Sequence, residues 1–165
     1  MDLDESLKPS AEAEVVLRRA GWSPERQVDI SQWVEPLRQD GNEVFPVAAG
    51  ILRSYGGLSF KGPRQKRGTR HDFDVNPVHW YGERDRLVDI ESITGRSACP
   101  LGETSGAAML AVLDDGRVVG DFDGCIIQIS DSWKGALDNL ILGRGEDILL
   151  AEDYDKPVEP RPWHP

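Results

Sequence analysis

Residues 107–122 read AAMLAVLDDGRVVGDF, and they indicate two antiparallel strands joined by a tight turn. The first part, Ala107 to Leu113, is nearly all apolar, which is typical of a strand covered on both faces. Asp115-Gly116 then favours a short hairpin, because glycine tolerates the positive φ that such a turn requires. The segment from Arg117 to Phe122 returns as the second strand, and Cys125 to Ile129 is expected to form a third.

Helical periodicity predicts five helices around these strands. They are expected to begin near Ser10, Ser31, Pro46, Glu83 and Trp133. Glycines end three of them, at Gly21, Gly56-Gly57 and Gly143, and Pro36 is expected to kink or shorten the second. Helices early in the chain, strands late and a closing helix predict an α+β fold, with a largely antiparallel sheet flanked by helices.

The chain is expected to contain one domain, at residues 10–143. Residues 1–9 would be an N-terminal extension, and residues 144–165 an acidic, proline-rich and poorly packed tail. Residues 71–75, His71-Asp72-Phe73-Asp74-Val75, alternate as a half-buried strand does, which would place Asp72 and Asp74 together on its outer face. The basic segment 61–70 has the composition of an exposed loop.

Composition restricts the location and the partners of the protein. The 165 residues, 39% hydrophobic and 29% charged, describe an ordinary globular protein. No apolar run is long enough for a membrane span, no secretory signal is visible, and two cysteines make no disulfide framework, so we expect a cytoplasmic protein. The net charge of −10 argues against direct binding to nucleic acid or to an anionic membrane. It suits a basic protein partner, although acidity also simply favours solubility. The sequence does not fix the oligomeric state.

No motif in the sequence indicates catalysis, a cofactor or a metal site. Strand alternation places His71 opposite the two nearby aspartates, so these side chains are not expected to converge on a metal ion. Cys99, with no orienting motif beside it, is expected to be structural rather than half of a nucleophilic pair with His71 or His79. Residues 102–106, GETSG, are not a phosphate loop because no lysine follows the glycine. We therefore expect no enzymatic activity and no cofactor.

Several short motifs occur in a characteristic order along the chain. They are Ala20-Gly21-Trp22, Arg26, Val28-Asp29, Trp33, Gly56-Gly57-Leu58, Pro100-Leu101-Gly102, Asp115-Gly116-Arg117-Val118 and Ala136-Leu137. In this order they resemble the SUKH superfamily, and more narrowly the third subfamily of SUKH immunity proteins from bacterial polymorphic toxin systems. The resemblance spans roughly residues 13 to 143, and we assign its motif residues structural roles. Trp22 and Trp33 are expected in the core.

The resemblance implies a protein that binds and neutralises a cognate secreted or contact-delivered toxin domain, often one that processes nucleic acid. The alternative is a SUKH-type scaffold or regulatory module without a toxin partner. Acidic side chains are the expected contacts to a basic toxin: Asp72, Asp74, Glu83, Asp85, Asp121 and Asp123. Trp80 and Tyr81 are candidate aromatic anchors, with packing in the core as the equally weighted alternative.

Overall fold

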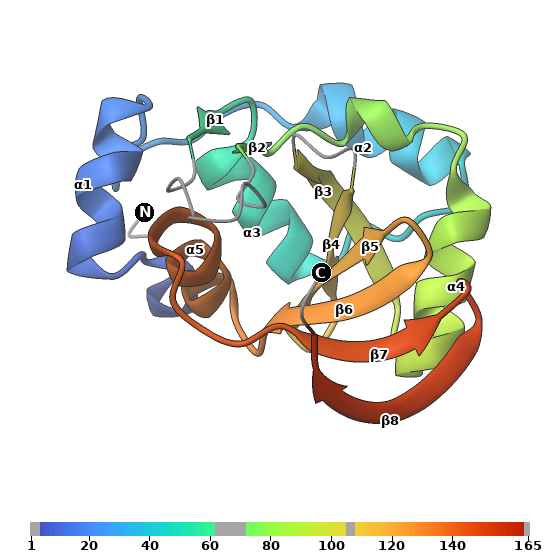
Figure 1. The fold of residues 1–165 in the computed structure, drawn as a ribbon. Helices are drawn as coiled ribbons and strands as arrows, with labels where there is room; N and C mark the ends of the chain where they lie inside the picture. The colour runs from blue at the N-terminus through green and yellow to red at the C-terminus, as the bar shows by residue number, and fades with distance from the viewer. Residues whose placement is uncertain (1–3, 62–71, 105–107, 164–165) are drawn as a thin grey trace.

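The computed structural model describes residues 4–61, 72–104 and 108–163. Its helices are η1 (Glu5–Leu7), α1 (Ala11–Arg19), α2 (Ser31–Gln39), α3 (Pro46–Tyr55), η2 (Pro77–Trp80), α4 (Arg84–Thr94) and α5 (Trp133–Leu142). Its strands are β1 (Ser59–Phe60), β2 (Phe73–Asp74), β3 (Ala98–Thr104), β4 (Met109–Leu113), β5 (Val118–Phe122), β6 (Cys125–Ser130), β7 (Ile148–Glu152) and β8 (Lys156–Pro162). Within the described residues the strands form one antiparallel sheet in the order β1 to β8 (Figure 1). This confirms the predicted α+β class.

Strand β4 crosses the middle of the molecule, and all five of its side chains are buried. Leu110 and Val112 pack in the larger hydrophobic cluster, which also takes residues from α1, α2, α3 and α5. Met109, Ala111 and Leu113 belong to a second cluster on the other side, together with side chains of α4. The central strands therefore have α4 on one face and the remaining α-helices on the other (Figure 1). This arrangement explains the nearly uninterrupted apolar run in the sequence.

The predicted turns and caps are confirmed at the ends of the elements. The Ser10 side chain accepts a hydrogen bond from the Ala13 amide at the start of α1. Gly116 has a φ of 93° in the β4–β5 turn, where its amide donates to the Leu113 carbonyl. Trp22 and Trp33 are both buried, as expected. Leu7 also joins the core, and its carbonyl accepts a 2.6 Å hydrogen bond from the Tyr55 hydroxyl, so residues of the N-terminal extension pack against the domain.

Pro36 was expected to kink or shorten the second helix; it does not shorten it, because α2 continues through Pro36 to Gln39. Proline has no amide hydrogen, so the carbonyl four residues earlier, that of Gln32, receives no helical hydrogen bond from it. The Tyr81 hydroxyl supplies a donor there, 3.3 Å from the Gln32 oxygen. A side chain from the end of η2, distant in sequence, thus compensates for the proline.

The prediction of a poorly packed tail after residue 143 is also wrong. Strand β7 pairs with β6, and β8 pairs with β7, so the tail completes the sheet. Leu149 and Ala151 are buried, which explains why this segment is ordered against β6. Strand β8 contains Pro157, Pro160 and Pro162 and lies at the edge of the sheet, where a missing amide donor is tolerated.

Across the described residues, none of the helices has the length and apolar character needed to cross a membrane.

Candidate functional site

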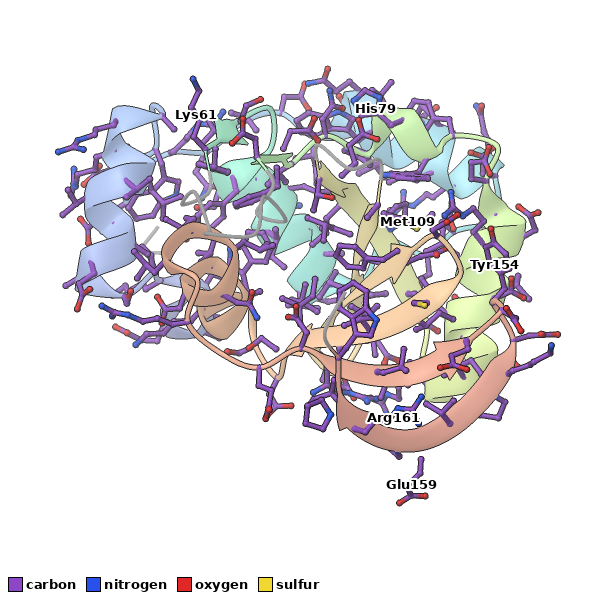
Figure 2. The ribbon with its side chains drawn as sticks, viewed as in Figure 1. Lys61, His79, Met109, Tyr154, Glu159 and Arg161 are labelled. Carbon is purple, nitrogen blue, oxygen red and sulfur yellow. The ribbon has the colours of Figure 1, made fainter. Side chains whose placement is uncertain are left out.

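An acidic groove of about 830 Å³ opens where α4 meets two turns of the sheet. We define the acidic groove by its lining residues: Glu83, Asp85, Arg86, Asp89, Asp123, Asp153, Tyr154 and Asp155. The first four come from the start of α4, the fifth from the β5–β6 turn, and the last three from the β7–β8 turn. In Figure 2, Tyr154 lies at the end of the β7–β8 hairpin beside α4. Six of the eight side chains are carboxylates, so the groove has a strongly negative surface.

A buried ion pair connects α4 to the β5–β6 turn beside this groove. Arg86 Nη2 lies 2.9 Å from Asp121 Oδ2, and the carboxylate is only 2% exposed. The other carboxylate oxygen, Asp121 Oδ1, accepts a 2.9 Å hydrogen bond from the Gly124 amide. The Arg86 guanidinium also lies 4.9 Å from the centre of the Trp80 ring, within the range of a cation–π contact. These contacts position the start of α4 relative to the turn.

The two turns that contribute to the groove are joined to each other. The Tyr154 amide donates a 2.8 Å hydrogen bond to the Gly124 carbonyl. Three residues other than glycine have a positive φ in the described part of the chain, and all lie in these turns: Asp123, Asp153 and Tyr154. Such a backbone conformation costs of order 1 kcal/mol or more per residue and is frequent at functional sites. The turns thus hold their side chains in a defined arrangement.

The acids of the groove interact unfavourably with one another. Burial raises the pKa of Asp89, and three neighbouring carboxylates raise it further, those of Asp155, Asp85 and Asp121. Nearby, burial raises the pKa of the Cys125 thiol, with further contributions from Glu152, Asp121, Asp123 and Asp153. Among the described residues, only Asp153 of the six lining acids forms an ion pair, with the exposed Lys156. A cationic group that entered the groove would relieve this repulsion.

The structure places the predicted contact residues in three environments: the acidic groove, the interior and a separate part of the surface. Glu83, Asp85 and Asp123 line the acidic groove. Asp121 is buried beneath it, and Trp80, 5% exposed, packs against α4 and donates its indole N–H to the Gly102 carbonyl. Neither buried side chain is presented to a partner in this conformation.

The other predicted contacts lie away from the groove. Asp72 is exposed, and it precedes a strand of only two residues. Asp74 is half-buried, 3.7 Å from His79. Figure 2 shows His79 on a different part of the surface from Tyr154. Tyr81 is half-buried in a second groove. His71 and nearly all of the predicted basic loop lie outside the described residues.

Sequence reasoning missed five residues of the groove: Arg86, Asp89, Asp153, Tyr154 and Asp155. Three of them lie in the β7–β8 turn, within the segment that was expected to be a poorly packed tail. The apolar segment Ile148-Leu149-Leu150-Ala151 is the sequence signal that would have indicated a strand there.

The motif residues build a scaffold beside the second groove, of about 460 Å³. The Arg26 guanidinium donates to the carbonyls of Ser54, at 3.2 Å, and Gly56, at 2.8 Å, and so ties the first loop to the end of α3. Burial lowers the pKa of Arg26. The Asp29 carboxylate accepts hydrogen bonds from the Ser31 amide and hydroxyl at the start of α2. The remaining motif positions pack or turn the chain: Gly21, Leu58, Pro100, Gly102, Gly116 and Arg117.

The fold and the site together describe an α+β binding protein with an acidic surface groove. Residues 9–143 match the sequence model of a family described as SUKH-3 immunity protein. The chain therefore belongs to the SUKH-3 immunity protein family, and this membership implies a toxin as its partner. No curated protein and no solved structure matches the chain. The family match ends at residue 143, before the β7–β8 hairpin that supplies three of the groove residues.

Proposed function

We propose that this protein binds a basic, secreted or contact-delivered toxin domain through the acidic groove and neutralises it by occlusion, in the cytoplasm of the cell that makes both proteins. The observation that supports the groove as the contact is the convergence of six carboxylates from three segments that are distant in sequence. The protein acts by binding, without turnover and without a cofactor. It contacts the toxin and does not bind nucleic acid directly.

A toxin that processes nucleic acid suits this surface. Such a toxin needs lysine and arginine side chains to hold a phosphate backbone. Carboxylates that face the same basic side chains compete with the substrate for them, and complementary charge speeds the encounter of the two proteins. Tyr154, 43% exposed at the groove, offers an aromatic face to an arginine or lysine side chain.

The position of the β7–β8 hairpin bears on specificity. The hairpin lies outside the residues matched by the family, whereas the start of α4 and the β5–β6 turn lie within them. One side of the groove is therefore formed by residues within the family match, and the other side by the hairpin, which lies outside that match. Discrimination among related toxins is therefore assigned to the hairpin side of the groove.

The test is co-expression with the toxin-like domain encoded beside this gene. We expect growth rescue and a one-to-one complex that survives purification. The triple variant Glu83→Gln/Asp85→Asn/Asp123→Asn should abolish rescue or weaken binding by about 10-fold or more, because it removes three charges from the groove. The control Glu25→Gln/Glu35→Gln/Glu146→Gln removes the same charge from exposed acids outside the groove and should retain full rescue.

Equal loss in both triple variants would contradict the groove as the contact and indicate a general charge effect. Wild-type protein that neither rescues growth nor forms a complex would contradict immunity against that domain. It would favour the alternative of a scaffold or regulatory module of the same superfamily.

A further inference from the structure

Three potential metal ligands meet on the surface away from the acidic groove. Asp74 on β2 and Glu103 on β3 are register partners across the sheet, and His79 lies on η2. His79 Nε2 is 3.7 Å from Asp74 Oδ2 and 3.7 Å from Glu103 Oε1. One ligand atom from each of the three residues lies within 4.8 Å of the other two. Figure 2 shows His79 on the outer surface, so solvent ions have access to the cluster.

The backbone around these side chains holds them in place. A Cβ atom on Gly102 would lie 2.0 Å from the Asp74 carbonyl oxygen, so only glycine allows β3 to approach β2 this closely. The Trp80 indole N–H donates a 2.7 Å hydrogen bond to the Gly102 carbonyl and so fixes η2, with His79, against β3. The Glu103 amide donates to Asp74 Oδ1 at 3.3 Å, which leaves Oδ2 directed towards His79. Support of this kind around a ligand is what orients a metal site.

The distances fit ligands that share an ion better than groups that bind each other. At 3.7 Å the imidazole is too far from either carboxylate for a hydrogen bond. Two ligands at roughly 2.1 Å from a tetrahedral ion lie about 3.4 Å apart, close to the 3.7 Å that separates His79 Nε2 from each carboxylate oxygen.

The charges fit as well. Within the described residues, His79 is the only basic side chain within 4.0 Å of the Asp74 and Glu103 carboxylates. Two carboxylate ligands offer two negative charges, which a divalent cation balances.

We propose that Asp74, His79 and Glu103 bind a divalent transition-metal ion, with Zn²⁺ as the best match. The imidazole favours zinc over Mg²⁺ and Ca²⁺, which prefer all-oxygen ligands, and the absence of sulfur in the set disfavours copper(I). Three protein ligands leave a fourth position for water. This proposal is independent of the proposed function.

Isothermal titration of the full chain with ZnCl₂, after removal of bound metal with a chelator, tests the site. Wild-type protein should bind one zinc ion per chain. Asp74→Asn, His79→Ala and Glu103→Gln should each weaken that binding by about 10-fold or more. Asp72→Asn removes an equal charge two residues away, and His164→Ala removes another imidazole, and both should bind zinc as the wild type does. MgCl₂ should not produce the one-to-one binding.

Zinc binding that is unchanged in the three ligand variants, or lost equally in the two controls, would overturn the proposal, as would the lack of a one-to-one site. A second measurement protects against misfolded variants. In wild-type protein with ¹⁵N-labelled histidine, zinc should shift the Nε2 resonance of His79, and an unshifted resonance at saturating zinc would also overturn the proposal.

Discussion

Asp121 and Asp123 lie two residues apart and have opposite environments. Asp121 is 2% exposed, paired with Arg86 and bonded to the Gly124 amide. Asp123 is exposed in the adjoining turn and lines the acidic groove. A buried carboxylate with these partners holds the structure together, whereas an exposed one is available to another molecule. At the scale of the residue, the same type of side chain therefore has two different roles at the end of β5 and in the turn that follows it.

This difference gives a direct prediction for stability. Asp121→Asn should lower the free energy of unfolding by about 2 kcal/mol or more, because it leaves Arg86 without its buried partner. Asp123→Asn is the matched control, since asparagine tolerates the positive φ at this position, and it should change stability by less than about 0.5 kcal/mol. Urea denaturation of both variants, followed by tryptophan fluorescence, measures the two effects. Equal stabilities would contradict the structural role assigned to Asp121.

The sequence did not distinguish these two acids for a physical reason. Strand β5 is buried on both faces, so alternation along it does not mark one face as exposed. Burial of Asp121 depends on Arg86, which reaches it from α4, a helix 35 residues earlier in the chain. No local pattern contains that information. The sequence also left the role of Trp80 open, because an aromatic residue in a turn suits both a core and a contact surface.

At the scale of the element, local chemistry predicted most helices and strands well. Ser10, Pro46 and Gly143 mark boundaries through capping and backbone geometry, which depend on near neighbours only. The β7–β8 hairpin was missed because proline usually indicates irregular structure. At a sheet edge that rule fails, since one side of the strand needs no donors. The missed hairpin accounts for three of the five missed groove residues.

The hairpin should contribute to stability mainly through β7. A chain ending at Gly145 loses β7 with its buried Leu149 and Ala151, and should lose about 3 kcal/mol or more of unfolding free energy. A chain ending at Asp155 keeps β7 and loses only β8, whose side chains are nearly all exposed, and should lose about 1 kcal/mol. Urea denaturation followed by far-ultraviolet circular dichroism compares the two. Similar losses in both truncations would contradict this division.

At the scale of the whole molecule, the groove exists only because three segments meet: the start of α4 and two hairpin turns. The net charge of −10 predicted an acidic surface, but the position of the acidic groove could be identified only from the complete fold. Composition thus indicated that the protein is acidic, and topology determined where the acidic side chains are concentrated.

The proposed charge-driven encounter predicts a specific dependence on salt. The association rate constant for the toxin domain should fall by about 10-fold between 50 and 500 mM NaCl, because screening shortens the reach of the groove's field. The dissociation rate constant should change much less. Surface plasmon resonance measures both, and the groove triple variant should show a flatter dependence than the control triple variant. An association rate that is independent of salt would contradict electrostatic steering.

The prolines of β8 affect the tendency of the protein to aggregate at high concentration. At high concentration, chains with exposed strand edges can pair with one another and aggregate into fibrils. Pro157, Pro160 and Pro162 remove three amide donors from this edge strand, which makes it a poorer template for another strand. The edge formed by β8 should therefore resist strand pairing between chains when the protein is concentrated.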